Sequence, residues 1–325
     1  MSRNSFPKDQ LILSILLTLS VVFAGLVSAG ELKDVNHKAV TIWSEGVRLS
    51  GDLYRPKGIA TGEKLPGILL VPGWGGSKEN LKKNYATHFA KLGFIVLAFD
   101  FKSWGQSDGP LVANEVLPAS NEATEMTVVV THIRKVVNPF SMLADVRAAL
   151  HYLGGEPQVM PENLGIWGTS FGGGLAMVTA ANDDRIKVLV DQMGPVNYAY
   201  NLRGLSIGTT RKTEELTARG ELPPYPGPTM SKSPGLKGYP NWAALKRYNP
   251  IKHAGQITVP TLIIDAENEQ LFDRKMNGAL LHEALKTQTD SRYVTYPGKH
   301  YDMYRGENLK SARKKAADWF LQHLK

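Results

Sequence analysis

The sequence predicts an α/β protein with a mostly parallel sheet, helices on both faces and a cap insertion. Five short segments are almost continuously apolar, as are strands buried on both faces of a parallel sheet: 67–71, 94–99, 164–167, 188–190 and 261–264. Segments with helical periodicity lie between them, at 80–91, 141–153, 173–182 and 273–286. Strands and helices that alternate in this way imply right-handed crossovers within one sheet.

The two ends of this pattern predict further elements. Residues 39–44 and 47–54 alternate apolar and polar side chains around Glu45 and Gly46, which predicts an antiparallel hairpin. A last strand is predicted at 293–296, and a basic amphipathic helix follows it at 309–324. Residues 110–139 mix loop residues with the apolar run 128–130 and receive no assignment.

Composition bounds the class of protein. The chain has 325 residues, of which 42% are hydrophobic and 21% charged, close to the globular average. It has no cysteine, which excludes disulfides, thiolate metal sites and thiol nucleophiles. The net charge of +8 is modest for this length, and no basic stripe is interleaved with aromatic residues. We therefore expect no nucleic-acid partner.

The amino terminus resembles a secretory leader. Arg3 and Lys8 precede an apolar run from Leu11 to Val27, and small residues follow up to Ala29. This pattern predicts a signal peptide at 1–29, cleavage after Ala29, and a mature domain at 30–325 that is secreted or periplasmic. No stable membrane association is expected after cleavage. The alternative is an uncleaved anchor, although the run of 17 residues is slightly short of the ~20 that span a bilayer.

Residues 195–258 form a connection too long for a simple loop between a strand and a helix. The segment contains a run of prolines from Pro223 to Pro240, together with Trp242. An insertion of this length in a compact domain is usually a functional lid, so we predict a cap here; the alternative is a disordered loop. By position, Trp74 and Phe101 are expected to line the wall opposite the cap.

The segment Gly168-Thr169-Ser170-Phe171-Gly172 matches the Gly-x-Ser-x-Gly nucleophile elbow. A predicted buried strand precedes it and a predicted helix follows it, which is the context that places a serine on a sharp, strained turn. Ser170 is therefore the candidate nucleophile. Gly204-Leu205-Ser206-Ile207-Gly208 matches the same pattern without a strand before it, and we interpret it as a chance match.

The base and the acid are sought later in the chain, because proteins with such an elbow between a strand and a helix order their triad as serine, acid, histidine. His300 follows the last predicted strand, where an imidazole can reach back to Ser170. Asp265 and Glu269 both follow the strand 261–264, and the residues alone leave the acid open between them. The glycine-rich loop after residue 71 places the Trp74 N–H, together with that of Phe171, as candidate oxyanion donors.

With these motifs the chain resembles the α/β-hydrolase superfamily from about Val40 to Leu324. The segment 100–109 is similar to the Asp-x-Arg-Gly-x-Gly-x-Ser segment of that superfamily, with Lys102 and Ser103 replacing the usual Arg and Gly. Residues 161–173 look like the branch of dienelactone-hydrolase-like and X-Pro-dipeptidyl-peptidase-like proteins. The resemblance implies the α/β-hydrolase fold and puts the acid at Glu269, where relatives usually have Asp. Dienelactone hydrolases proper use cysteine, so Ser170 argues against that particular activity.

These features predict a serine hydrolase that cleaves small-molecule carboxylic esters through a Ser170–His300–Glu269 triad and an acyl-enzyme. No metal or organic cofactor is required. A peptidase or amidase of the same fold is the alternative within enzymes; this sequence shows no pattern of the separate propeller or jelly-roll domain that screens peptides in such relatives. A catalytically silent scaffold used for binding is the alternative outside enzymes. The oligomeric state is left open.

Overall fold

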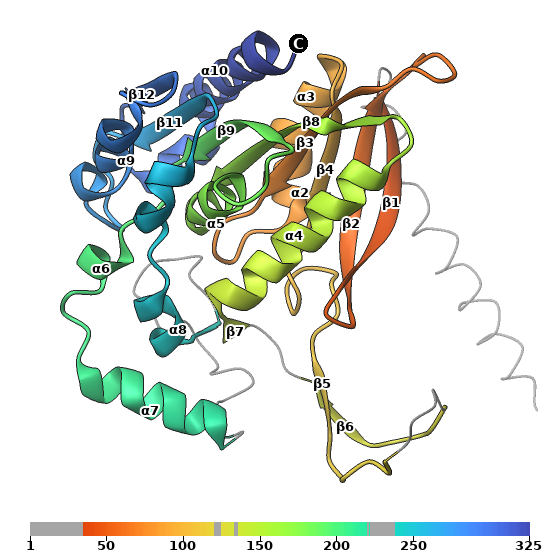
Figure 1. The fold of residues 1–325 in the computed structure, drawn as a ribbon, viewed down its shortest axis with the longest axis vertical. Helices are drawn as coiled ribbons and strands as arrows, with labels where there is room; N and C mark the ends of the chain where they lie inside the picture. The colour runs from red at the N-terminus through yellow and green to blue at the C-terminus, as the bar shows by residue number, and fades with distance from the viewer. Residues whose placement is uncertain (1–34, 120–124, 133–135, 220, 222–237) are drawn as a thin grey trace, which may run out of the picture.

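The computed structural model describes residues 35–119, 125–132, 136–219, 221 and 238–325. The predicted signal peptide, 1–29, lies outside these residues. One eight-stranded sheet organises the described chain (Figure 1), in the order β1-β2-β4-β3-β8-β9-β11-β12. β1 and β2 pair antiparallel, as do β2 and β4, and every other neighbouring pair is parallel. The predicted α/β class with a mostly parallel sheet is confirmed.

Four of the five apolar runs are extended at one or both ends, whereas β4 begins one residue later than its run. Their bounds are β1 Val35–Ser44, β2 Val47–Pro56, β3 Leu65–Val71, β4 Ile95–Phe99, β8 Val159–Thr169, β9 Ile186–Gln192, β11 Thr261–Ala266 and β12 Ser291–Tyr296. Most side chains of β3, β4 and β9 are buried on both faces, which explains why these strands read as continuous apolar runs.

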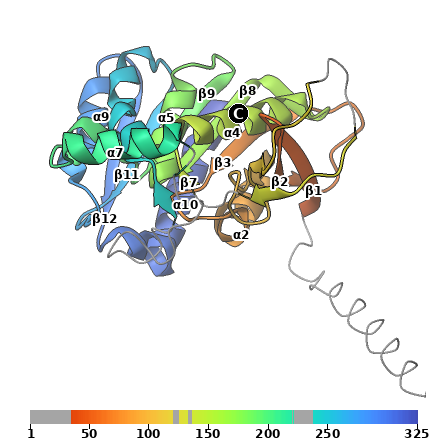
Figure 2. The same ribbon diagram turned by 90° about the horizontal axis from the view of Figure 1, so that it is seen from below.

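Helices cover both faces of the sheet, as Figures 1 and 2 show together. One apolar cluster joins the sheet to α4 (Pro139–Gly155), α5 (Phe171–Ala180) and α9 (Gly278–Leu285). A second cluster on the other face joins it to α3 (Thr87–Lys91) and α10 (Gly306–Leu324). The sheet is thus the middle of three layers, and its carboxyl edge is where the loops converge.

Two predicted helices differ in detail from the structure. The helix expected at 80–91 is α2 (Lys78–Leu81), a π-helical turn η1 (Lys82–Ala86) and α3, because a π turn inserts a residue that periodicity does not reveal. The helix expected at 273–286 is the 3₁₀ turn η3 (Arg274–Met276) followed by α9. Asn277 separates them, and its Oδ1 accepts hydrogen bonds from the backbone N–H groups of Val196 and Asn197.

The predicted insertion at 195–258 contains short elements over the carboxyl edge. They are α6 Tyr198–Asn201, α7 Ile207–Ala218, β10 Tyr239–Pro240, α8 Trp242–Arg247 and the 3₁₀ helix η2 Pro250–Gln256. β10 pairs with β7 (Val136–Val137), which precedes α4. The asparagine side chains that begin α6 and α8 accept backbone hydrogen bonds, so the polar residues of this segment define its helix starts.

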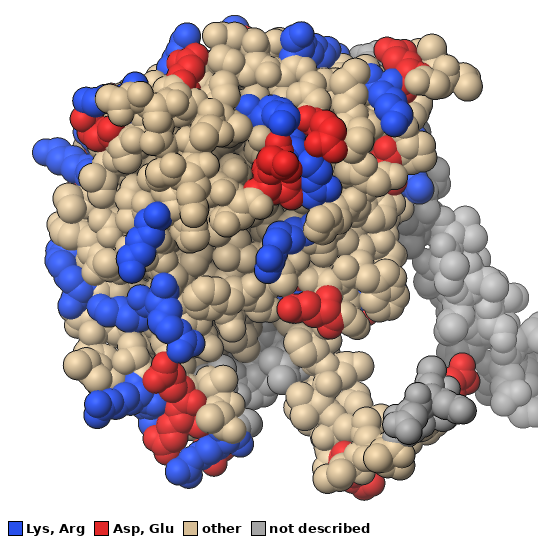
Figure 3. All heavy atoms as spheres, viewed as in Figure 1, with Lys and Arg blue, Asp and Glu red and all other residues tan. Residues whose placement is uncertain are grey.

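Residues 110–139, unassigned from the sequence, include a projecting arm. β5 (Leu111–Ala113) and β6 (Val130–His132) pair antiparallel at the bottom of Figure 1. Large apolar side chains of the arm are exposed: Leu111, Val112, Val116, Leu117, Met126, Val128, Val129 and Val130. Figure 3 shows the arm as mainly uncharged, whereas the body beside it carries interspersed basic and acidic side chains. No helix among the described residues is long and apolar enough to cross a bilayer.

Candidate active site

Ser170 occupies the turn between β8 and α5, as predicted. Its φ of 52° and ψ of −129° lie in a region that side chains rarely adopt. The backbone N–H of Ser170 donates to the Gln192 carbonyl oxygen at 2.8 Å, which anchors the turn to β9. The flanking glycines are required because a Cβ at Gly172 would lie 2.4 Å from the Pro72 carbonyl oxygen, and one at Gly168 2.2 Å from the Gly172 oxygen.

His300 lies at the start of the 3₁₀ helix η4 (His300–Tyr304), directly after the loop that leaves β12. Its Nδ1 is 2.6 Å from Oε2 of Glu269, and both side chains are almost completely buried. The other carboxylate oxygen of Glu269, Oε1, accepts the backbone N–H groups of Gln270 and Leu271, each at 2.8 Å. The carboxylate is therefore fixed by three hydrogen bonds, and it fixes the imidazole in turn.

Asp265, the alternative acid, contacts a different partner. It lies within β11, where it pairs with Thr295 of β12, and its Oδ2 accepts a hydrogen bond from the Tyr293 hydroxyl at 3.0 Å. Its Oδ1 has no hydrogen-bond partner within the described chain. Burial raises the pKa of Asp265 to about 7, with the nearby charge of Glu269 adding to the effect and the Tyr293 hydrogen bond opposing it. Of the two candidates, Glu269 is the one that contacts His300.

Tyr304 was not anticipated from the sequence. It lies at the end of η4, its hydroxyl is 2.9 Å from the Thr169 hydroxyl, and it lines the same cavity as Ser170. Burial raises the pKa of Tyr304, so the phenol stays protonated. Its ring also packs edge-on against the His300 ring, at 5.9 Å between centroids. The only sequence signal was its position four residues after His300, on the same short helix.

The glycine-rich loop after β3 approaches the serine closely. A Cβ at Gly73 would lie 3.0 Å from the Ser170 Cβ and 2.9 Å from the Thr169 carbonyl oxygen. The Trp74 ring packs edge-on against Phe171, with 5.7 Å between ring centroids. The loop and the amino terminus of α5, which carry the predicted oxyanion donors Trp74 and Phe171, therefore lie side by side.

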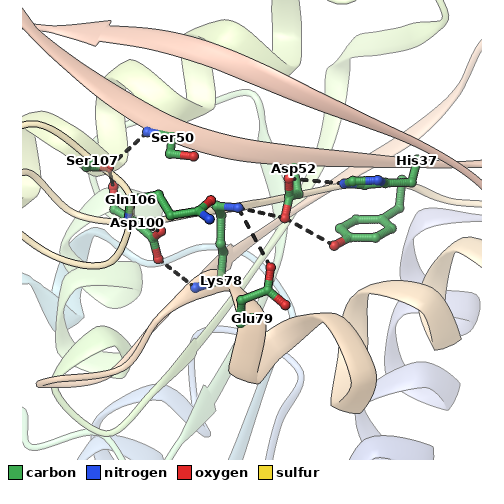
Figure 4. Close-up of polar contacts among 9 residues, drawn as sticks. His37, Ser50, Asp52, Lys78, Glu79, Asp100, Gln106 and Ser107 are labelled. Carbon is green, nitrogen blue, oxygen red and sulfur yellow. Dashed lines mark hydrogen bonds and ion pairs between the residues drawn. The ribbon is translucent and has the colours of Figure 1, made fainter. Parts of the chain in front are cut away.

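A buried polar cluster anchors the far end of this loop (Figure 4). The Lys78 ammonium donates to Asp52 Oδ2 at 2.9 Å, and Asp52 Oδ1 lies 3.0 Å from His37 Nε2. The Lys78 backbone N–H donates to Asp100 Oδ1 at 2.8 Å. Burial acts to raise the pKa of Asp52, but the hydrogen bonds from Lys78 and His37 outweigh it and lower that pKa. The loop thus ends in fixed contacts to β2 and to the end of β4.

The turn after Asp100 contains the two departures from the superfamily segment, Lys102 and Ser103. Ser103 replaces the usual glycine and takes a φ of +71°, while Lys102 forms an ion pair with Asp145 at 3.2 Å. Phe101, expected to face the cap, is instead buried against Phe99 and lines neither cavity described below. It belongs to the apolar cluster that also contains Phe99 and Trp104.

Two cavities meet at Ser170. The first, of about 380 Å³, contains Ser170, His300 and Tyr304 together with the glycine-rich loop and residues of α2 and η1. The second, of about 300 Å³, is lined by Trp74, Ser170 and Phe171 on one side and by residues of the insertion on the other. Ser170 and Trp74 are common to both cavities. Within the described residues no three His, Cys, Asp or Glu side chains are placed to hold a metal ion.

Two family models match this chain over half of its length or more. The model of the dienelactone hydrolase family matches residues 49–212, and that of the prolyl oligopeptidase family matches residues 140–325. The chain belongs to the α/β-hydrolase superfamily. Both matches include Ser170, and the second also includes Glu269 and His300.

Other proteins are similar to this hydrolase over most of its length. The quorum-quenching protein AidA of Acinetobacter baumannii is 25% identical over 297 residues, covering 81% of this chain and 88% of its own. Among solved structures, DcsB in complex with a substrate analogue has a TM-score of 0.66 at 19% identity, covering 89% of this chain and 99% of its own. The Pyrococcus furiosus esterase Pf2001 has a TM-score of 0.60 at 16% identity, covering 93% and 97%. The structural likenesses show the fold.

The close packing of the glycines beside Ser170 against backbone atoms predicts how an added methyl group changes the stability of this hydrolase. Gly172→Ala is expected to lower the free energy of unfolding by about 1–3 kcal/mol, because the new Cβ meets backbone atoms that side-chain rotation cannot move. Gly208→Ala is the matched control from the chance motif, since the nearest atom to its Cβ is Ser206 Oγ at 3.8 Å. Urea unfolding measures both, and equal effects would contradict the steric argument.

The buried carboxyl group of Asp265 predicts a pH-dependent stability. Because its pKa is near 7 in the folded hydrolase and near 3.8 when exposed, the folded state holds the proton more tightly between these values. The free energy of unfolding should therefore fall as pH rises from about 4 to 7, by on the order of 4 kcal/mol from this group. Asp265→Asn should remove that fall.

Urea unfolding of both proteins between pH 4 and 8 measures the effect. The informative quantity is the difference between the two curves. Burial raises the pKa of Asp191 in both proteins, and the charge of Asp265 raises it further in the wild type, so the difference reports these two carboxyl groups together. The free energy of unfolding of the variant should increase relative to that of the wild type as pH rises to 7. Above that pH the two curves should be parallel. Curves that are parallel throughout would show that Asp265 ionises normally.

Proposed function

We propose that this hydrolase cleaves carboxylic esters through a covalent acyl-enzyme on Ser170. The observation that carries the proposal is the His300 imidazole, which is hydrogen-bonded through Nδ1 to the buried Glu269 carboxylate and lines the same cavity as Ser170. An acceptor at Nδ1 keeps the proton there and leaves Nε2 free to act as a base. The strained backbone of Ser170, held by close-packed glycines, supports its role as the nucleophile.

In the acylation step, Ser170 Oγ attacks the ester carbonyl carbon while His300 Nε2 takes the hydroxyl proton. The carbonyl oxygen becomes an oxyanion, for which the backbone N–H groups of Trp74 and Phe171 are the proposed donors. Glu269 stabilises the imidazolium that forms. When the intermediate collapses, the bond to the alcohol oxygen breaks, and His300 gives its proton to that oxygen.

Deacylation repeats these steps with water as the nucleophile. His300 removes a proton from water, the hydroxide attacks the acyl carbon, and the proton returns to Ser170 Oγ as the carboxylic acid leaves. Tyr304 lines the same cavity as Ser170 and contacts the hydroxyl of the preceding residue, Thr169, so a phenol lies beside the proposed nucleophile. The scheme uses only groups of this chain, the ester and water.

A fluorophosphonate probe tests the proposal on the intact protein. We expect stoichiometric labelling of Ser170, located by peptide mass spectrometry, and turnover of p-nitrophenyl esters by the same preparation. Folded protein that neither labels nor turns over any ester would indicate a silent binding scaffold instead. The probe separates these two classes because it reacts with activated serines and not with ordinary ones.

A peptidase or amidase is the second candidate, favoured by the match of the prolyl oligopeptidase family model to residues 140–325. The chemistry is shared, since the same base protonates a leaving amine. A p-nitroanilide and a p-nitrophenyl ester with the same acyl group distinguish the two. Higher kcat/KM for the ester supports the proposal, and comparable or higher kcat/KM for the anilide favours the peptidase.

Export through the predicted signal peptide is part of the proposal, and its residues lie outside the described chain. Protein recovered from the periplasm or culture medium should begin at Gly30, because Ala29 ends the predicted cleavage site. Intact-mass measurement gives the terminus directly. A recovered chain that retains residues 11–27 and pellets with membranes would establish an uncleaved anchor.

A further inference from the structure

The two cavities at Ser170 differ in one residue that decides how a substrate is oriented. His300 lines the first cavity and is not among the residues that line the second. Ser170 and Trp74 line both, so the reacting carbonyl carbon lies where the cavities meet. An ester bound there must place its acyl group and its alcohol on opposite sides of this point.

We infer that the first cavity binds the leaving alcohol and the second binds the acyl group, which restricts the substrates to esters of an apolar acid with an uncharged, polar alcohol. The inference rests on the proposed function. In that mechanism, the leaving oxygen receives its proton from His300 and must therefore depart on the side of the imidazole. The acyl group, which stays bonded to Ser170, is left with the second cavity.

The second cavity is lined mainly by aromatic and aliphatic side chains: Phe171, Tyr198, Leu202, Trp242, Leu271 and Phe272. Its one asparagine, Asn201, is occupied by reciprocal hydrogen bonds to Asn277, each at 3.0 Å. None of the described residues that line it carries a charged side chain. A volume of about 300 Å³ corresponds to about ten non-hydrogen atoms at ~30 Å³ each, so an unbranched acyl chain of medium length fits.

The first cavity offers hydrogen bonds without charge. Asn80 and Asn84 line it, four positions apart in the chain. Ser77 and Tyr301 also line it, and the part of the chain that the structure describes contributes no Lys, Arg, Asp or Glu to this lining. An alcohol that carries further hydroxyl, carbonyl or amide groups would pair with these amides, whereas an ionic alcohol would lose its hydration without gaining a counter-charge.

One substitution in each cavity tests the two proposed roles independently. Leu202→Trp fills the second cavity, and Ile207→Trp is its control on the exposed face of α7, outside both cavities. Asn84→Leu removes an amide from the first cavity at similar volume, and Asn36→Leu is its control on the exposed side of β1. None of the four residues belongs to the proposed catalytic group.

The kinetic test uses esters that vary on one side at a time. Leu202→Trp should lower kcat/KM for an octanoyl ester by about tenfold or more relative to the acetyl ester with the same alcohol. Asn84→Leu should lower kcat/KM for the monoglyceryl ester relative to the hexyl ester of the same acid, again by about tenfold. Each control should leave both ratios unchanged.

Pre-steady-state measurement gives the sharper discrimination, because the alcohol has departed before the acyl-enzyme breaks down. Leu202→Trp should therefore change the breakdown rate of the octanoyl-enzyme, and Asn84→Leu should leave that rate unchanged. Exchanged effects, with Asn84→Leu altering breakdown and Leu202→Trp altering only alcohol preference, would overturn the assignment of the cavities. A wild-type enzyme that forms no acyl-enzyme on Ser170 would instead refute the proposed function, and the inference with it.

Discussion

Ser170→Ala is expected to lower kcat for ester hydrolysis by about 10⁶-fold, because Ser170 is the one nucleophile among the described residues that line both cavities. His300→Ala should cost about as much alone, and the double variant little more, since the two residues act as one unit. Steady-state turnover of p-nitrophenyl butyrate measures all three. Circular dichroism and unfolding curves show whether each variant keeps its fold.

Ser206→Ala is the matched control for this experiment. Ser206 lies in the second Gly-x-Ser-x-Gly match, but the structure places it at the amino terminus of α7, where its hydroxyl accepts the Thr209 N–H at 3.1 Å. Its removal should leave kcat unchanged and cost about 1 kcal/mol of stability through the lost helix cap. Loss of activity in Ser206→Ala with retention in Ser170→Ala would reverse the assignment of the nucleophile.

Glu269→Gln is expected to lower kcat by about 10⁴-fold. The carboxylate accepts from His300 Nδ1 on one oxygen and from two backbone N–H groups on the other, so both oxygens act as acceptors. An amide has only one acceptor end. If its oxygen faces His300, its NH₂ faces the Gln270 and Leu271 N–H groups; if it turns over, it donates toward Nδ1 and favours the wrong imidazole tautomer.

Asp265→Asn is the comparison that makes this result specific to Glu269. Asp265 hydrogen-bonds to Tyr293 and not to His300, so its amide variant should retain turnover within a few-fold. The kcat of both variants should be measured near pH 6, where the Asp265 carboxyl is still mostly protonated in the wild type. A crippled Asp265→Asn beside an active Glu269→Gln would make Asp265 the acid.

The parallel strands were predictable from the sequence because a strand buried on both faces of a sheet consists of a short, nearly continuous run of apolar residues. The sequence predicted the turn that holds Ser170 and the loop position of His300 because both depend on the local order of strand, turn and helix. The choice between Asp265 and Glu269 depended on where β11 ends. The strand continues to Ala266, and the loop beyond it then turns Glu269 toward His300.

Other features depend on contacts between distant segments, which periodicity does not reveal. The arm formed by β5 and β6 has no buried face, so its apolar residues carried no recognisable strand pattern. Tyr304 joins the site because η4 folds back on β8, bringing a phenol to Thr169 from 135 positions away. The side on which Phe101 packs was likewise fixed by its neighbour Phe99 rather than by the motif around it.

The glycines around Ser170 have a consequence for laboratory evolution of this enzyme. Gly172 lies against Pro72 of the opposite loop, Gly168 lies against Gly172, and Gly73 lies against Thr169. A larger residue at any of these three positions must displace backbone atoms of the segment that faces it. A change of one neighbouring side chain therefore does not compensate for it. Combinatorial libraries should therefore keep these positions constant and place their diversity at the side chains that line the two cavities, where altered shape does not disturb the strand-to-helix turn.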